Sequence, residues 1–169
     1  FDRGILAFAS SSFSSSTRSA VTLGMNGSMS RFALKNDHLY TVSLSDLKVF
    51  GLQNPDQPQQ LNTVQIGWGI ETIYPFKDQL FIGSNTGMFI FNVSNPAAPQ
   101  KTGSFSHAFA CDPVIADDTH AYVTLRSGTN CRATINQLDV LDITNLQSAV
   151  LVAFVSILTA IPRHHNHGQ

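Results

Sequence analysis

Glu71 and Asp112 are the two carboxylates whose spacing best suits a chemical role, because they stand forty-one residues apart at equivalent positions of an internal repeat, with Ser30 at the third such position. Paired carboxylates hold a cation through oxygen ligands, or raise one another's pKa for acid–base work. His107, five residues before Asp112 in SHAFACDP, could add an imidazole. The alternative is that each carboxylate only accepts hydrogen bonds from amides at a strand end.

Three further residues are candidates for ligand binding or crosslinking. Trp68, in IGWGIE, is expected to pack between neighbouring sheets, as a large aromatic residue usually does, with stacking on a sugar ring beside Glu71 as the alternative. Arg126 begins an insertion, residues 126–137, that is long enough to reach over a face and bind, or is a solvated loop. Cys111 and Cys131 lack CxxC spacing, so a disulfide between them and two separate thiols both remain open.

Motifs for metals and cofactors are missing from the sequence. His107, Cys111 and Asp112 are too few for a transition-metal site, which normally has a third or fourth committed ligand. The tract RHHNHGQ could chelate a metal, but we expect it to be a disordered or non-native end. The glycines follow no P-loop or dinucleotide pattern, and there is no GxSxG, HExxH or Ca²⁺-loop motif. We therefore predict no cofactor and no metal.

Composition limits the classes of partner. Charged residues make up 12% of the chain and the formal net charge is −1. Such a composition does not provide the concentrated positive charge that binds a phosphate backbone, so nucleic-acid binding is not expected. No run approaches the roughly 20 apolar residues that cross a bilayer. The longest apolar run, VLVAFVSILTAI at residues 150–161, is predicted to be core. The chain starts at Phe1 rather than methionine, so we expect a processed product or a fragment.

The repeat has a period of forty-one residues. HLYTVSLSDLKVFGLQNPDQP, residues 38–58, is followed by QLFIGSNTGMFIFNVSNPAAP, residues 79–99, and a third copy begins at His120 as HAYVTL and resumes after a nine-residue insertion as QLDVLDITN. Short alternating runs rich in β-branched and aromatic residues predict strands at residues 31–34, 39–42, 47–52 and 61–66 of the first copy. The first three runs have counterparts in both other copies, and the fourth has one in the second copy, at residues 102–107. Asn36-Asp37, Lys77-Asp78 and Asp117-Asp118 predict tight hairpins, and Asn-Pro closes the third strand of the first two copies.

The segments DLKVFGLQNPDQP, GMFIFNVSNPAAP and QLDVLDITNLQSA resemble the LVIVD-repeat family of bacterial β-propeller-like proteins, and the resemblance covers residues 27–152. It implies an all-β fold, a partial β-propeller of three four-stranded blades, at residues 27–67, 68–108 and 109–152. We expect residues 1–26 to be a Ser-rich flexible lead-in and residues 153–169 to be a tail without the repeat. The third copy departs from the pattern because it loses both prolines of the turn. Three blades do not close a ring of four to eight, so we expect a partial array or closure by self-association.

The function predicted from these features is a non-catalytic binding module of an exported bacterial protein, in the periplasm, on the cell surface or outside the cell. Its ligand would be a protein or a glycan, held at the propeller axis or by the inserted loop. Trp68, Glu71, His107, Asp112 and Arg126 are the expected contacts. The rival interpretation is a hydrolase or lyase that uses Glu71 and Asp112 with His107. A third is a structural spacer.

Overall fold

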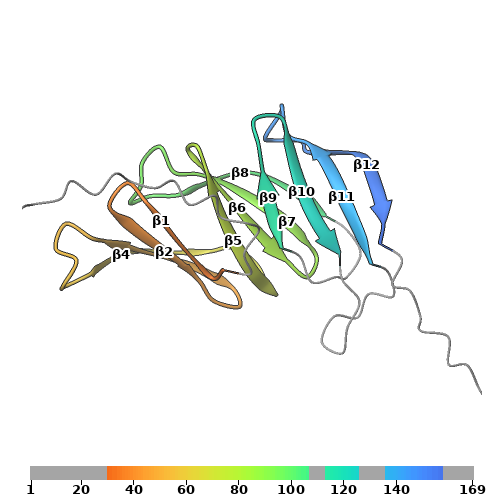
Figure 1. Cartoon of the computed structure of the whole chain (residues 1–169). Helices are drawn as coiled ribbons and strands as arrows, with labels where there is room; N and C mark the ends of the chain where they lie inside the picture. Colours follow the sequence, from red (N-terminus) through yellow and green to blue (C-terminus); the bar gives the residue numbers. More distant parts are fainter. Residues whose placement is uncertain (1–29, 107–112, 126–135, 158–169) are drawn as a thin grey trace, which may run out of the picture.

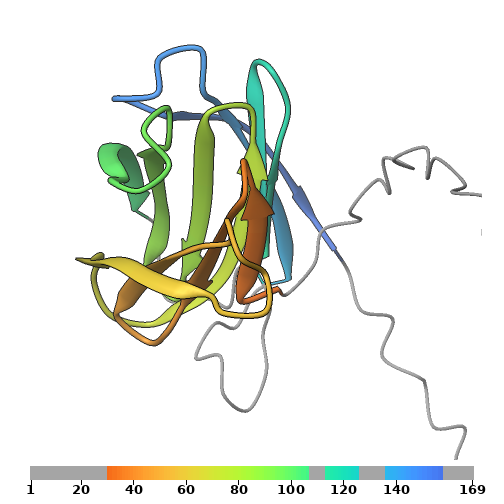
Figure 2. The same ribbon diagram turned by 90° about the vertical axis from the view of Figure 1, so that its left-hand side faces the viewer.

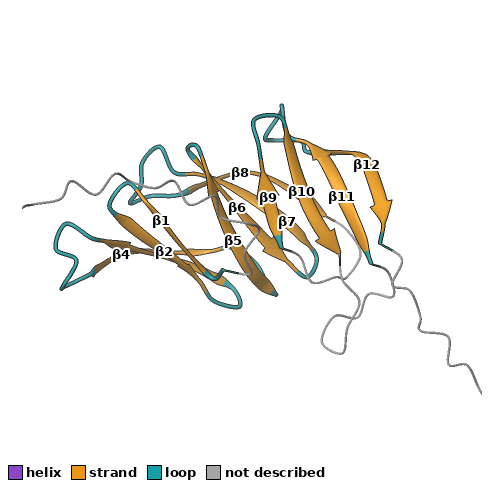
Figure 3. Cartoon of the chain, viewed as in Figure 1, coloured by secondary structure: helices purple, strands orange, loops and turns teal. Residues whose placement is uncertain are grey.

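The structure is a computed structural model that describes residues 30–106, 113–125 and 136–157. Within these ranges the chain forms twelve strands and no helix (Figure 3). The strands build three four-stranded sheets, in each of which all neighbours are antiparallel. The prediction of an all-β fold with four strands per repeat is therefore confirmed.

Each sheet is formed by consecutive strands of one repeat. Sheet 1 contains β1 (Phe32–Lys35), β2 (His38–Val42), β3 (Asp46–Gly51) and β4 (Gln59–Gln65). Sheet 2 contains β5 (Ile70–Phe76), β6 (Gln79–Ser84), β7 (Gly87–Asn92) and β8 (Gln100–Ser106). Sheet 3 contains β9 (Val114–Ala116), β10 (His120–Leu125), β11 (Gln137–Asp142) and β12 (Val150–Ser156).

The predicted hairpins between the first two strands of each sheet are confirmed. Asn36 and Asp37 both have positive φ, at 48° and 55°, as the two central residues of a type I′ turn require. These residue types tolerate the left-handed region because their short side chains hydrogen-bond locally. In sheet 3 the amide of Asp117 donates to the His120 carbonyl at 2.8 Å. Local sequence therefore fixes where each pair of strands reverses.

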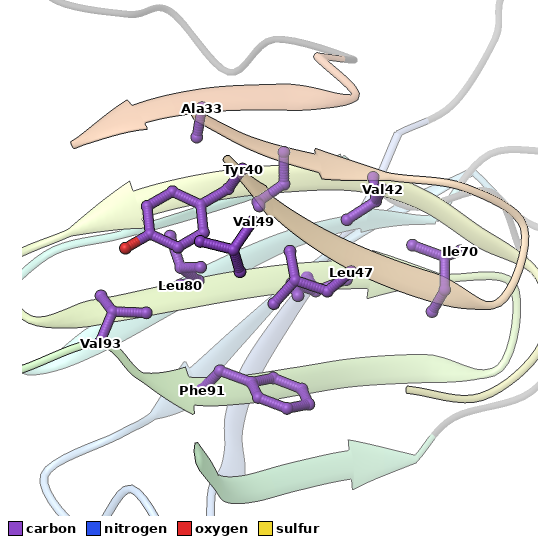
Figure 4. Close-up of a cluster of buried hydrophobic side chains, with 11 residues drawn as sticks. Ala33, Tyr40, Val42, Leu47, Val49, Ile70, Leu80, Phe91 and Val93 are labelled. Carbon is purple, nitrogen blue, oxygen red and sulfur yellow. The ribbon is translucent and has the colours of Figure 1, made fainter. Parts of the chain in front are cut away.

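The three sheets lie one after another, with the first strands of neighbouring sheets in contact, β1 with β5 and β5 with β9 (Figures 1 and 2). One core lies between sheets 1 and 2, and it includes Tyr40 and Leu47 of sheet 1 with Leu80 and Phe91 of sheet 2 (Figure 4). A second core lies between sheets 2 and 3, where Phe81 and Met88 meet side chains of β9 to β11. We call the side of a sheet that packs on the preceding sheet its front face, and the side that packs on the following sheet its rear face.

The middle sheet is buried on both faces, and its sequence reflects this. In β3 buried Leu47 and Val49 alternate with partly exposed Lys48 and Phe50. In β7 the run MFIF places Met88 and Ile90 in one core and Phe91 in the other. Continuous apolar runs are typical of strands covered on both sides, whereas alternation marks strands with one open side.

Polar contacts repeat along the stack and fix how neighbouring sheets align. The hydroxyl of Tyr40 donates to the Pro96 carbonyl at 2.9 Å, and the Asn62 side-chain amide donates to the Ala97 carbonyl at 3.1 Å. At the hairpin turns, two ion pairs join successive sheets, Lys35 to Asp78 at 3.4 Å and Lys77 to Asp118 at 2.5 Å. Ion pairs at such exposed turns contribute about 0–1 kcal/mol each, so they align the sheets more than they hold them.

The end of sheet 3 differs from the prediction in two ways. The expected boundary at Val152 falls inside β12, which runs to Ser156 as the fourth strand of the third copy. Every residue of β12 is exposed, so the described part of the run at residues 150–161 is not core as predicted. The physical reason is position: the outermost strand lies at the edge of its sheet, beyond the side chains of sheet 2 that cover the inner strands.

Gly103 in β8 gives a direct test of the close approach between sheets 2 and 3. A Cβ at this position would lie inside van der Waals contact of the Leu146 carbonyl oxygen and 3.2 Å from the Cα of Gln147. Because backbone atoms cannot rotate away, we expect Gly103→Ala to destabilise the fold by about 1–3 kcal/mol, as overpacking does. Urea unfolding followed by circular dichroism measures the loss.

Gly51→Ala is the matched control in β3, because the nearest atom to its added Cβ is the flexible end of the Gln53 side chain. We expect it to lower the unfolding midpoint by less than Gly103→Ala does. Equal midpoints for the two variants would contradict the packing of β8 against the turn after β11.

Candidate interaction surfaces

Two of the residues predicted to form a site, Trp68 and Glu71, lie within the described part of the structure. His107, Cys111, Asp112, Arg126 and Cys131 lie outside it. The carboxylate pair of Glu71 and Asp112, the inserted loop and the crosslink between the cysteines therefore stay predictions. Within the described residues, no group of three histidine, cysteine, aspartate or glutamate side chains is placed to hold a metal ion.

Trp68 is 81% exposed, so the prediction that it packs between sheets is wrong. It lies in the loop between β4 and β5, whose backbone is tied to neighbouring loops rather than being free. The amides of Ile66 and Gly67 donate to the Ser45 carbonyl, and the amide of Ile70 donates to the Leu44 carbonyl at 3.1 Å. These hydrogen bonds hold the loop backbone in place, and the indole lies in solvent.

Leu44 shares this end of the molecule with Trp68. It lies in the loop between β2 and β3 and is 62% exposed. The three backbone hydrogen bonds described above join the two loops, so the two apolar side chains belong to one surface. Gly69, with φ of 73°, supplies the left-handed conformation that lets the second loop turn back into β5.

Glu71 is the irregular residue at the start of β5. The register with β6 shifts between Ile70 and Thr72, so Glu71 sits at a bulge, and its side chain is partly buried. Ser30 occupies the equivalent position of the first repeat, and its carbonyl accepts a hydrogen bond from the Ile73 amide at 2.9 Å. Ser30 lies two residues before β1, whereas Glu71 is the second residue of β5, so both repeat-equivalent positions lie close to the start of the first strand of their sheet.

A pocket of about 360 Å³ opens between the hairpin ends of sheets 2 and 3. Its buried lining includes Phe81 and Ile143, and its exposed lining includes Lys77, Asp117 and Asp118. The corresponding space between sheets 1 and 2 holds the Tyr40 hydroxyl, whereas the phenylalanine at position 81 has none.

The acidic side chains of this pocket are already engaged. Asp118 pairs with Lys77, Asp78 pairs with Lys35, and Asp117 accepts hydrogen bonds within its own turn. The pocket therefore presents satisfied carboxylates, which argues for a structural role.

Asp117 closes the turn between β9 and β10. Its carboxylate accepts hydrogen bonds from the amides of Thr119 and His120, at 2.8 and 2.7 Å, and from the Tyr122 hydroxyl at 2.9 Å. The two backbone hydrogen bonds, followed by that of Tyr122, lower the pKa of Asp117 to about 2. The hydroxyl that donates to this carboxylate has its own pKa raised by the same bond.

β12 carries the largest set of exposed apolar side chains among the described residues. These are Val150, Leu151, Val152, Phe154 and Val155, and Ile157 follows directly after the strand. The equivalent strands β4 and β8 read QQLNTVQ and QKTGSFS, which are mostly polar, whereas β12 reads VLVAFVS. β12 is also the terminal strand of its sheet, so within the described residues its outer edge has no neighbouring strand. Sequence reasoning missed this surface, although the contrast between the fourth strands was readable.

No protein-family model matches the chain, and no curated protein sequence matches it. Among solved structures, the N-terminal domain of Nup159 is 13% identical over 73% of this chain and 33% of that chain, with a TM-score of 0.49. A chain in an S. cerevisiae complex of Dbp5 bound to Nup159 and Gle1 is 8% identical over 75% of this chain and 46% of that chain, with a TM-score of 0.32. This chain thus spans about one third of the length of the first of these chains and under half of the second. At these TM-scores the likeness identifies neither a family nor a function. No helix among the described residues is long and apolar enough to cross a membrane.

The lowered pKa of Asp117 predicts how stability changes in acid. The pKa of this carboxylate is about 2 in the folded chain, below the usual value near 3.9. Its contribution to stability is therefore complete at pH values above about 4 and is lost as the pH falls toward 2. We expect Asp117→Asn to flatten the fall of the melting temperature between about pH 4 and pH 2, because the substituted side chain does not titrate. Thermal unfolding at closely spaced pH values measures this.

Tyr122→Phe is the companion variant, because it removes one of the four donors to Asp117 and leaves the two backbone amides and the Thr119 hydroxyl. It should move the acid transition to slightly higher pH without abolishing it. If Asp117→Asn leaves the acid limb of the profile identical to that of the unmodified chain, the turn carboxylate is not what stabilises the fold in this range.

Proposed function

We propose that this chain is a non-catalytic interaction module, a segment of a β-propeller-type array, and that its ligand is another protein. The array geometry is supported by the meander order of every sheet and by the contact of successive first strands on one side of the stack. It is also supported by the apolar core that equivalent strands build at both junctions. A rigid stack of this kind holds its edges and end loops in fixed positions, as binding scaffolds do.

The observation that carries the proposal is the apolar outer strand β12. A terminal strand presents unpaired backbone donors and acceptors, and natural proteins usually protect such edges with charge or proline. β12 has neither, and Phe154 is 61% exposed beside Val152 and Val155. A partner that adds a strand here would satisfy the backbone groups and cover the side chains at once. Only a polypeptide offers both, so the ligand class is protein.

Trp68 and Leu44 form a second exposed surface at the ends of the strands, and we propose it as an additional contact. Tryptophan is over-represented among the residues that dominate protein–protein binding energy. The neighbouring leucine favours an apolar partner surface over a glycan, which would need hydrogen-bonding groups around the ring. The resemblance of three segments to LVIVD repeats further supports assigning the module to an exported or surface bacterial protein.

Site-specific photocrosslinking tests the choice of surface. A photoreactive phenylalanine analogue is placed at position 154, at position 68 and, as a control, at Ser104, which is exposed on the polar strand β8. We expect a protein adduct from position 154 in the cells that make the protein, and none from position 104. An adduct from position 68 alone would place the ligand at the loop end and overturn the assignment to β12.

Once the adduct is identified, the purified partner allows a quantitative test by titration calorimetry. We expect Phe154→Glu to raise the Kd by about tenfold or more, since truncating a central apolar contact costs at least about 1–2 kcal/mol. The fold should not change, because position 154 is exposed. Thr63→Glu on β4 is the matched control, being exposed on an equivalent outer strand, and it should bind as the unmodified chain does. Equal Kd values for the two variants would contradict the proposal.

A further inference from the structure

The molecule builds the same inter-sheet interface twice. At the first junction the rear face of sheet 1 (Ala33, Tyr40, Val42, Leu47 and Val49) packs on the front face of sheet 2 (Ile73, Leu80, Ile82, Phe91 and Val93). At the second, the rear face of sheet 2 (Tyr74, Phe81, Met88 and Ile90) packs on the front face of sheet 3 (Val114, Ala121, Val123, Leu141 and Ile143). The repeat aligns these sets position by position. A rear face and a front face of this repeat are therefore complementary surfaces.

Among the described residues, one face of each kind has no sheet packed on it. The front face of sheet 1 presents Phe32, Leu39, Thr41, Phe50 and Leu52, which are the equivalents of the buried front-face residues of sheet 2. The rear face of sheet 3 presents Ile115, Tyr122, Thr124, Leu138 and Val140, the equivalents of the rear-face residues of sheets 1 and 2. All ten are partly or fully exposed, and most are apolar. Phe32 is 58% exposed, whereas its counterpart Ile73 is 1% exposed.

The turn after the third strand shows the same contrast. In sheet 2 this turn is covered by sheet 1: Pro99 is buried, and the carbonyls of Pro96 and Ala97 accept hydrogen bonds from Tyr40 and Asn62. In sheet 1 the equivalent residues 53–58 are all exposed. Within the part of the chain that the structure describes, the turn of sheet 1 thus lacks the neighbour that its counterpart has.

Sheet 3 carries side chains at the positions that approach the next turn at the existing junctions. Ala153 stands at the position of Asn62 and Gly103, which approach the turn of the following sheet at those two junctions. The ring of Tyr122 stands at the position of Tyr40, while its hydroxyl donates to Asp117 of its own sheet. Ala153 is the one small side chain between bulky residues in VLVAFVS, so the backbone of β12 can come close to a turn there.

We infer that two copies of this chain dock head to tail, with the rear face of sheet 3 of each copy packed on the front face of sheet 1 of the other. Three sheets per chain then give a closed ring of six, within the four to eight that propellers use. The contact joins two different surfaces and repeats twice, so association stops at a dimer instead of growing into a fibre. This inference rests on the two end faces and not on the edge of β12, so it stands or falls independently of the proposed function.

Charge makes this junction weaker than the two within the chain. At the existing junctions a lysine on the hairpin of one sheet pairs with an aspartate on the next, Lys35 with Asp78 and Lys77 with Asp118. At the proposed junction Asp117 and Asp118 occupy the lysine positions and face Asp37, the equivalent of Asp78. Like charges that face one another repel, and dissolved salt screens this repulsion. The dimer should therefore tighten as salt is added.

Sedimentation velocity on the full 169-residue chain tests the dimer. We expect a species of twice the 18.4 kDa chain mass at micromolar concentration. Leu39→Glu on the front face and Val140→Lys on the rear face should each give a monomer, and mixing the two variants should restore a 1:1 dimer through the one intact junction. Ser104→Glu on the middle sheet is the control and should remain dimeric. A dimer that survives either face variant, or an unmodified chain that stays monomeric at about 100 µM, would overturn the inference.

Asp37→Asn provides a gain-of-function test that does not depend on a variant tolerating a charge on an apolar face. Asparagine tolerates the positive φ of 55° at this position, so the turn is preserved. We expect the variant to dimerise several-fold more tightly than the unmodified chain in low salt and equally in high salt. An unchanged dimerisation constant in low salt would show that this turn does not face the aspartates of a second copy, and would contradict the head-to-tail arrangement.

Discussion

The structure depends on one constraint: each four-stranded sheet has two faces, and both must find a cover. A single sheet of this size exposes apolar side chains on at least one side, and a small sheet gains independent stability only by burying an apolar face. Here the rear face of one sheet covers the front face of the next, and the middle sheet is buried on both sides. Stability along such a stack is therefore a property of its junctions, as in other repeat proteins.

The same constraint explains which surfaces remain open. The two end faces and the apolar strand β12 are the parts of the described chain that the stacking does not cover, and they are open for different reasons. The end faces lack a neighbour of the same kind, whereas β12 lies at the outer edge of its sheet, where even a following sheet would leave one edge free. An end face can be covered by another sheet of the same repeat, whereas the edge of β12 can be covered by an added strand.

The candidate site shows where sequence reasoning stops. It expected Trp68 to pack between neighbouring sheets, whereas the indole is exposed in the loop that leads into β5. Glu71 lies at the start of β5, and its pairing with Asp112 stays a prediction. Sequence reasoning also placed the run at residues 150–161 in the core, because continuous apolar residues are usual in buried strands. The first error could not be detected from pattern alone, since it concerns which neighbour lies beside a loop. The second could have been detected, because the contrast between apolar β12 and the polar strands β4 and β8 was readable in the sequence.

The sequence by itself determined the repeat, the positions of the hairpin turns and eleven of the twelve strands, because these depend on local backbone preferences and on the alternation of side chains within a few residues. The tertiary structure alone decided burial. Phe91 in the middle sheet and Phe50 in the first occupy equivalent positions of the repeat, and one is buried while the other is partly exposed. Identical local patterns receive different environments because exposure is set by the adjacent sheet, which lies some forty residues away along the chain.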